Sequence, residues 1–201
     1  MSAQSPGSVT RATLLDAAVA FAAGTGLTDV SLRQMASALG TSHRMLIYHF
    51  GSKEGLLVAV VDEVERRQRE AMAALGDDAA LTPSESMRRM WRTLAESSMW
   101  PFERLFFEVY GQALQGRTPM VAFLDTVVES WLEPATAVGV RAGLPRRRAR
   151  AWARLGLAAT RGLLLDLLAT EDRKGCDDAM EALIAALPLE LSGGSAAAGG
   201  R

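Results

Sequence analysis

The two histidines of the chain, His43 and His49, share one short segment with Ser42, Arg44 and Tyr48. Their i, i+6 spacing puts the two imidazoles on different faces of a helix, and no cysteine or carboxylate lies at ligand spacing beside them. Hydroxyl, guanidinium and imidazole groups on one short helix instead suit hydrogen bonding to base edges, where arginine can hold guanine bidentately. The pattern therefore favours a helix that reads nucleic acid over a metal or catalytic centre.

Signatures of catalysis are absent from the rest of the sequence. There is no Ser-His-Asp order, no GxGxxG or P-loop, no HExxH, and no third histidine. The single cysteine, Cys176, excludes an internal disulfide framework and a cysteine-rich zinc site, and we expect it to be a small residue near a helix start. We expect no metal and no cofactor, and an enzyme is the least favoured class.

Residues that start and end helices show how the segment with the two histidines is positioned. Ser31 and Gln34 form a capping box that starts one helix at Leu32, and Gly40 ends it. Ser42 can cap a second helix from His43 to about His49, and Ser52 caps a third after Gly51. Two short helices separated by a turn of about three residues are the helix-turn-helix arrangement, whose second helix enters the major groove. Because the net charge is only −1, any DNA contact must be local.

The composition predicts an all-α fold. Of the 201 residues, 49% are hydrophobic, and these are mostly Ala, Leu and Met, which favour helices over strands. Periodicity and caps predict about nine helices, which run over residues 9–23, 32–40, 43–49, 53–75, 83–98, 101–115, 119–140 (bent at Pro134), 145–169 and 177–187. The predicted organisation is a DNA-binding domain over 1–52, a connecting helix over 53–75, a ligand-binding and dimerisation domain over 76–191, and a disordered tail over 192–201.

The run from Ser31 to Leu57, SLRQMASALGTSHRMLIYHFGSKEGLL, resembles the DNA-binding domain of the TetR (AcrR-type) family of bacterial regulators. The turn, the His49-Phe50 pair and the SKE start of the next helix fall at the spacing of that family. The resemblance covers about the first quarter of the chain, and it implies homodimers that bind a pseudo-palindromic operator. It also implies a variable helical body that houses an inducing ligand and forms the dimer interface.

Candidate DNA contacts follow from the helix-turn-helix pattern and from this resemblance. Lys53, at the start of the third helix, can meet a phosphate beside the backbone amides of that helix. His49 has an alternative role as a helix-end cap or a phosphate contact without sequence information. The family places a tyrosine where this chain has Ile47, so either Tyr48 replaces its backbone contact or Tyr48 reads a base, and Ile47 can be a core residue. The candidates are Arg33, Thr41, Ser42, His43, Arg44, Tyr48, His49 and Lys53.

Aromatic and methionine residues gather in the middle of the chain and predict an adaptable apolar cavity. Ordinary core packing is the alternative for each ring taken singly. The candidate ligand-binding residues are Met87, Trp91, Trp100, Phe106, Tyr110, Phe123 and Trp131, and the groups expected to orient a ligand are Tyr110, Gln112 and Arg92. We expect a small, mainly apolar ligand in a cavity of at least about 300 Å³.

Small and apolar residues recur at helical spacing in the last two predicted helices and predict a dimer interface. Its candidates are Leu155, Ala159, Gly162, Leu163, Met180, Leu183, Ile184 and Leu187. In a lone bundle the same face would be ordinary core.

Together these features predict a cytoplasmic, homodimeric repressor that binds duplex DNA and is released from it by a small apolar ligand. No apolar run approaches the roughly 20 residues that span a bilayer, so we expect no membrane partner. The alternative is a helical adaptor that recognises a protein through its aromatic body and keeps the first three helices as a structural head.

Overall fold

The computed structural model describes residues 10–25, 27, 30–78 and 81–186. These residues form nine α-helices and two 3-10 helices, and none of them forms a strand. The α-helices are α1 (Arg11–Thr25), α2 (Leu32–Ala38), α3 (His43–Phe50), α4 (Lys53–Asp77), α5 (Pro83–Leu94), α6 (Trp100–Leu114), α7 (Glu129–Arg141), α8 (Arg146–Thr170) and α9 (Arg173–Ala186). The 3-10 helices are η1 (Ser97–Met99) and η2 (Met120–Asp125). The all-α expectation is confirmed.

Side-chain caps set the start of several helices at the residues that the sequence indicates. Ser31 and Gln34 form a capping box at α2, and Thr82 and Glu85 form another at α5. Ser42 Oγ accepts a hydrogen bond from the Met45 amide at 3.2 Å and so fixes the first turn of α3. Each cap satisfies an amide that would otherwise have no partner in the first turn of a helix.

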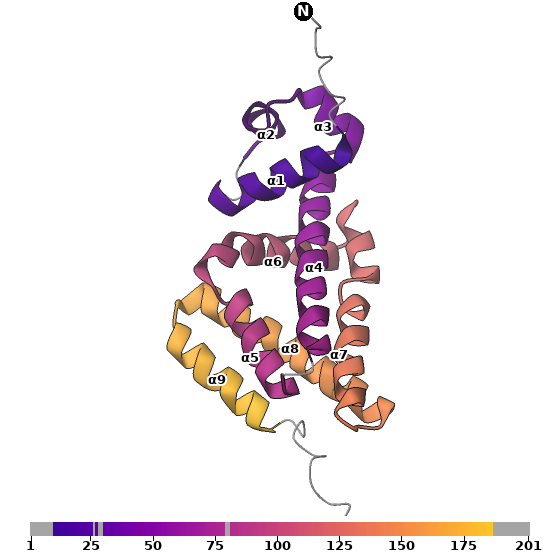
Figure 1. The fold of residues 1–201 in the computed structure, drawn as a ribbon. Coiled ribbons are helices and arrows are strands. Elements are labelled where there is room, and N and C mark those ends of the chain that lie inside the picture. The colour runs from indigo at the N-terminus through magenta and orange to yellow at the C-terminus, as the bar shows by residue number, and fades with distance from the viewer. Residues whose placement is uncertain (1–9, 26, 28–29, 79–80, 187–201) are drawn as a thin grey trace, which may run out of the picture.

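Figure 1 shows the arrangement of these helices in space. Helices α1, α2 and α3 form one end of the molecule, which we call the head, and α5 to α9 form the other end, which we call the body. The long helix α4 starts in the head beside α3 and runs into the body, where it contacts α5, α6 and α7. The helix-turn-helix therefore lies at the extremity of the molecule, far from α9.

Two hydrophobic clusters hold the fold together. The first contains the buried side chains of α1 to α4 and continues through α6 and η2 to Val127. The second joins Trp91, Leu94 and Ala95 near α5 to the inner faces of α8 and α9. Because α6 and η2 share the cluster of the head, the head is packed onto part of the body and is not tethered through α4 alone.

Three elements differ from the expectation for the body. The helix expected over 83–98 ends at Leu94, and η1 follows it as a separate turn. The single helix expected over 119–140 is divided into η2 and α7, and three consecutive β-branched residues, Thr126, Val127 and Val128, separate the two. Such residues have lower helix propensity because their χ1 freedom is restricted. Pro134 lies inside α7. Helix α9 begins four residues before the predicted start, because the Asp172 carboxylate accepts a hydrogen bond from the Gly175 amide at 2.9 Å.

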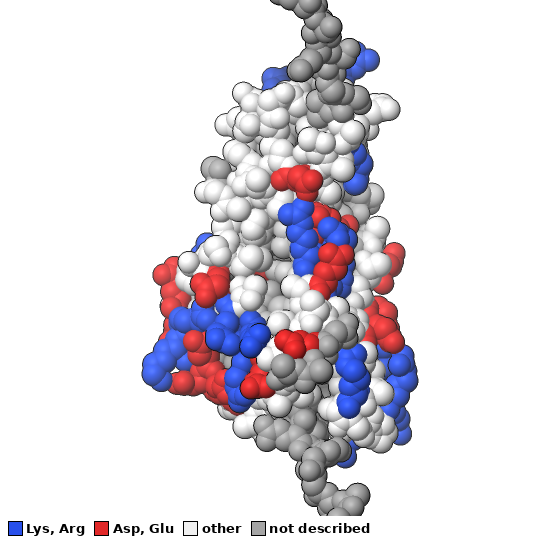
Figure 2. All heavy atoms as spheres, viewed as in Figure 1, with Lys and Arg blue, Asp and Glu red and all other residues white. Residues whose placement is uncertain are grey.

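Figure 2 shows basic and acidic side chains side by side along the exposed part of α4, below a head that carries few charges in this view. Arg67 reaches from α4 to Asp16 of α1 at 2.5 Å, and Arg66 pairs with Glu63 at 2.7 Å. Exposed pairs of this kind each contribute little to stability. Among the described helices, none combines the length and the apolar character that a membrane crossing requires.

Candidate nucleic-acid interface and inner cavity

The turn between α2 and α3 is fixed by glycine conformation and by packing. Gly40 has a φ of 64°, in the left-handed region that a residue after a helix commonly adopts. The amide of Thr41 then donates to Ala36 O at 2.9 Å. Met35 of α2 and Leu46 of α3 are fully buried and hold the two helices against each other. This packing fixes the direction in which α3 presents its outer face.

The outer face of α3 is polar and exposed. Ser42, His43 and Arg44 are exposed to solvent, and Tyr48 exposes 78% of its surface. Ile47 is 39% exposed, so it is not a core residue. A helix end that offers hydroxyl, imidazole and guanidinium donors on a rigid two-helix support can hydrogen-bond to base edges.

The remaining candidate DNA-contacting residues lie on other elements or are half-buried. Arg33 is exposed on α2, whereas Thr41 in the turn and Lys53 at the first turn of α4 are half-buried. His49 is half-buried between Tyr48, with ring centroids 4.9 Å apart, and Phe50. Its Nε2 is shielded from solvent and has no hydrogen-bond partner among the described residues. The structure therefore brings His43, Arg44 and Tyr48 together on one surface and turns the Nε2 of His49 inward.

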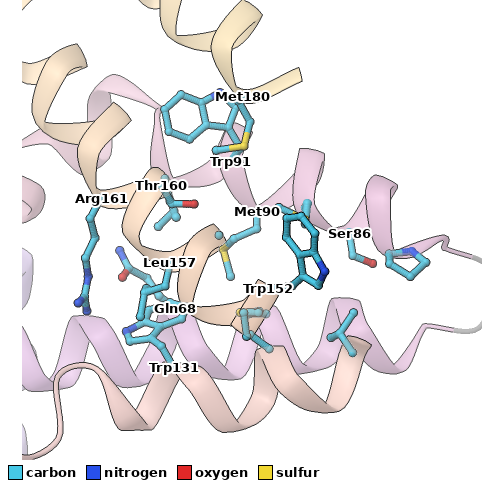
Figure 3. Close-up of a pocket in the computed structure, with 18 of the residues that line it drawn as sticks. Gln68, Ser86, Met90, Trp91, Trp131, Trp152, Leu157, Thr160, Arg161 and Met180 are labelled. Atoms are coloured by element: carbon cyan, nitrogen blue, oxygen red, sulfur yellow. The ribbon is translucent and has the colours of Figure 1, made fainter. Parts of the chain in front are cut away.

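A cavity of about 150 Å³ lies in the body. Its walls come from α4, α5, α6, α7, α8 and α9, and Figure 3 shows Trp131, Trp152 and Leu157 beside it. The volume is below the 300 to 1,000 Å³ that is common for ligand pockets and below our expectation. Flexible methionines form part of the wall, so the cavity can enlarge by rotamer changes of Met72, Met87, Met90 and Met180.

Four of the seven predicted ligand-binding residues line this cavity: Met87, Trp91, Phe106 and Trp131. The other three, Trp100, Tyr110 and Phe123, are not among its lining residues. Tyr110 and Phe123 pack with Phe106 in an aromatic group of the first cluster, and Trp100 packs against the second cluster. Gln112 and Arg92, expected to orient a ligand, also lie outside the lining. A linear sequence shows that rings are close along the chain but does not show which side of a helix faces a void.

The polar lining of the cavity was missed by sequence reasoning. It includes Glu65 and Gln68 of α4, Glu103 of α6, and Thr160 and Arg161 of α8. A signal for the α4 pair existed, because these residues continue the helical face that Leu57, Val61 and Val64 begin. Polar residues on an otherwise apolar face indicate a buried polar site.

Burial determines the electrostatics of this polar lining. Trp131 Nε1 donates a hydrogen bond to Glu65, and Gln68 Nε2 donates to Glu103 Oε1 at 3.0 Å. Burial raises the pKa of Glu65, and it raises the pKa of Glu103 to about 7 although the bond from Gln68 acts in the opposite direction. Burial also lowers the pKa of Arg161. The cavity is therefore apolar over most of its wall and carries ionisable groups at one end.

The predicted dimer residues fall into two groups. Leu155 and Gly162 are exposed on α8, and Ala159 and Leu163 are half-buried. Met180 and Ile184, in contrast, are 2% and 3% exposed and pack in the second cluster inside the protomer, so they belong to its core and not to a surface. Leu183 packs partly against the same cluster, and Leu187 lies outside the described residues, as does the 192–201 tail. Within the described residues, the predicted apolar pattern therefore follows the inner face of α9, where Met180 and Ile184 lie.

A surface stripe of small and apolar residues does run along the outer faces of α8 and α9. We call it the α8–α9 stripe; its members are all exposed, and they are Ala151, Leu155, Ala158, Gly162, Leu165 and Ala169 on α8, with Gly175, Ala179, Ala182 and Ala186 on α9. Their spacing alternates between three and four residues, which keeps one face along each helix.

Within the described part of the chain, no group of three metal-ligating side chains gathers.

Comparisons with known proteins agree with this geometry. Residues 14–60 match the family described as bacterial regulatory proteins, tetR family. Over 122 residues the chain is 29% identical to the HTH-type transcriptional regulator EthR of Mycobacterium tuberculosis, a match that covers 56% of this chain and 51% of that regulator. The chain thus spans about half the length of the curated relatives it matches.

Solved structures extend the likeness to the whole fold. A TetR-family transcriptional regulator from Pectobacterium atrosepticum is 25% identical, with a TM-score of 0.65 over 90% of this chain and 91% of that one. A TetR-family regulator from Cytophaga hutchinsonii is 18% identical, with a TM-score of 0.71 over 96% of this chain and the whole of that one. The second likeness, at this identity, concerns the fold alone.

Proposed function

We propose that this chain, which belongs to the tetR family of bacterial regulatory proteins, is a homodimeric repressor that binds operator DNA in the cytoplasm and releases it when a small ligand enters the body. The observation that carries the proposal is the exposed face of α3, where His43, Arg44 and Tyr48 stand together at the tip of a helix-turn-helix.

Placed in a major groove, α3 would present its N-terminal residues to base edges. Arg44 is exposed and can hold the O6 and N7 atoms of guanine with two hydrogen bonds. Lys53 lies at the first turn of α4, whose Ser52-capped amides make a suitable phosphate site. Tyr48, exposed beside Ile47, is placed to contact either a base edge or the sugar-phosphate backbone.

The α8–α9 stripe supports the homodimer. An exposed apolar face on two adjacent helices is a self-complementary surface when a twofold axis brings a second copy against it. Small residues such as Ala158, Gly162 and Ala182 allow two helix backbones to approach closely. The stripe lies in the body, so both heads remain free to reach successive major grooves about 34 Å apart.

The cavity supports control by a ligand. Its aromatic, methionine-containing wall is typical of small-molecule sites, and its lining includes Phe106, which packs in the same cluster as the head. A ligand that binds the form of the dimer with unsuitable head spacing more tightly would release the operator, whereas equal affinity for both forms would have no effect.

Operator binding is tested by fluorescence anisotropy with duplexes from the DNA that flanks the gene, beside scrambled duplexes of equal length. Arg44→Ala is expected to weaken binding to the operator by about 1 to 3 kcal/mol and to leave scrambled DNA almost unchanged. Lys53→Ala is expected to weaken both and to make the salt slope shallower by about one unit. Equal affinity of the wild-type protein for operator and scrambled DNA would refute the regulator and favour the helical adaptor.

A further inference from the structure

Ile47 is an exposed apolar side chain on the outer face of α3. It exposes 39% of its surface and belongs to neither hydrophobic cluster. Among the described residues of the head, the exposed large hydrophobic side chains are Ile47 and Tyr48, and both belong to α3. The large apolar side chains that the described part of the head leaves open to solvent are thus confined to the helix that is proposed to enter DNA.

The position of Ile47 around the helix places it among the polar candidates for base contacts. At about 100° per residue, Ile47 lies about 40° from His43 and about 60° from Arg44, so it stands between these two exposed side chains. Leu46, the neighbour of Ile47, is fully buried and fixes the rotation of α3. The carbonyl oxygen of Ile47 accepts a hydrogen bond from the Gly51 amide at 2.8 Å, which holds the last turn. The side chain is therefore presented from a fixed backbone.

The chemistry of isoleucine decides what this side chain can contact on DNA. A β-branched residue in a helix has one strongly preferred χ1 rotamer, so the methyl groups of Ile47 keep their place and lose little freedom on binding. The side chain has no hydrogen-bond donor and no charge. Against a phosphate it would exclude water from the anionic oxygens and offer nothing in return, which is costly. Ile47 is therefore suited to a base edge and unsuited to the backbone.

An apolar group is available on one kind of base pair. The major groove presents donors and acceptors at every base pair, and the C5-methyl of thymine is the apolar group among them. Ile47 follows Arg44 by three residues, which is about 4.5 Å along the axis of α3, whereas successive base pairs are about 3.4 Å apart. The two side chains therefore reach different base pairs, and each can read its own.

We propose that Ile47 determines operator specificity by packing against the C5-methyl group of a thymine in each half-site. The inference rests on the proposed function, and it deepens that function by naming a base that the operator must contain. It also assigns a role to a side chain that is neither a hydrogen-bonding candidate nor part of the core.

The experiment removes the methyl group and nothing else. Deoxyuridine pairs with adenine as thymine does but lacks the C5-methyl. The operator duplex from the DNA that flanks the gene is prepared with all thymines replaced by deoxyuridine, and then with one symmetry-related pair of thymines replaced at a time. Binding of the full-length protein to each duplex and to scrambled DNA is measured by fluorescence anisotropy at one salt concentration.

Three variants turn the measurement into a double-mutant cycle between side chain and methyl group. Ile47→Ala removes the contact, and Ile47→Val keeps the β-branch but lacks one methylene group. Val140→Ala is the matched control, because Val140 is 41% exposed on a helix of the body and has no place in the proposed DNA interface. Since all three positions are exposed, each thermal unfolding midpoint should stay within about 2 °C of wild type.

The expected result is a methyl effect that depends on Ile47. For wild type, deoxyuridine at the contacted thymine should weaken binding about fourfold for one half-site and about fifteenfold for both. Ile47→Ala should bind the thymine operator at least about tenfold more weakly than wild type does, and the same duplex with deoxyuridine within about twofold of its thymine form. Ile47→Val should keep part of the methyl effect, and Val140→Ala should match wild type on every duplex.

The proposal is overturned if no pair of thymines shows a methyl effect in wild type, or if Ile47→Ala keeps the whole effect. It is also overturned if Ile47→Ala weakens scrambled DNA as much as the operator, since Ile47 would then contact the backbone. Selective operator binding without a methyl effect refutes this role of Ile47 and leaves the regulator intact. Equal wild-type affinity for operator and scrambled DNA refutes the proposed function itself.

Discussion

The head and the body of this molecule differ in how closely their side chains are packed. In the head, Leu14, Met35 and Leu46 are at most 2% exposed, and every helix start is fixed by a side-chain cap or a close backbone contact. In the body, tryptophans and methionines surround a void of about 150 Å³, and the buried carboxyl group of Glu103 accepts a hydrogen bond from the Gln68 amide. A surface that must match DNA requires one fixed geometry, whereas a site that must admit a ligand requires space and adaptable side chains.

The largest expected effect tests whether the body serves to pair two heads. Gly162→Arg places a charged side chain in the middle of the α8–α9 stripe and is expected to yield monomers. Operator affinity should then fall by about 100-fold to 10,000-fold, because the two heads no longer bind as one unit. Sedimentation gives the oligomeric state and circular dichroism the helix content. Ala73→Arg, an equal change at an exposed site of α4, should remain dimeric, and a dimeric Gly162→Arg protein would locate the interface elsewhere.

Matched truncations compare the packing of the two regions directly. Leu46→Ala removes a fully buried side chain between α2 and α3, and it should cost about 2 to 5 kcal/mol in the free energy of unfolding. Leu157→Ala removes a half-buried side chain that already borders the cavity, so its loss of contacts is smaller, and we expect less than about 1.5 kcal/mol. Urea unfolding measures both values. Equal costs would mean that the cavity wall is packed as tightly as the head.

Glu103→Gln tests the buried carboxyl group of the body in the absence of ligand. The folded pKa of about 7 lies above the ordinary 4.5, so the stability that the bound proton provides is complete below pH 4.5 and is lost as the pH rises towards 7. The variant lacks this loss, and its free energy of unfolding relative to wild type should rise by about 3 kcal/mol between pH 4 and pH 8. Urea titrations at several pH values measure the difference. A constant difference would show that Glu103 titrates normally.

The smallest expected effect compares two helix caps of the same kind. Ser42→Ala and Thr82→Ala each remove a cap and should each cost about 1 kcal/mol of stability. Only Ser42→Ala loosens the first turn of α3, so only this variant should also lose operator affinity beyond its stability cost. Thermal unfolding and anisotropy on the same samples separate the two effects. Loss of affinity in Thr82→Ala as well would mean that α5 contributes to head geometry.

The sequence predicted best where local chemistry decides the structure. The capping box at Ser31, the end of α2 near Gly40, the start of α3 at His43 and the start of α5 at residue 83 depend on residues within four positions of one another. The all-α fold followed from composition in the same way. These features needed no knowledge of which helices pack together.

Features that depend on packing between distant helices were missed. Glu65, Glu103 and Arg161 meet from three helices that are far apart in sequence, and no local spacing shows that they share a cavity. Met180 and Ile184 were placed on the outer surface because periodicity gives the spacing of an apolar face but not its direction. The exposed Ala179 and Ala182 lie within two positions of the buried Met180 along α9, and only the fold decides which of them face the core.

Helix α6 belongs to two structures at once, because Phe106 packs in the cluster of the head and also forms part of the cavity wall. If entry of a ligand weakens operator binding through this shared wall, thermodynamic reciprocity requires the operator to weaken ligand binding by the same factor. The concentration of ligand that half-saturates the protein would then increase with the number of operator sites that are occupied. Regulator molecules that are not on an operator would bind ligand first. The operators would be released only after these free molecules are saturated.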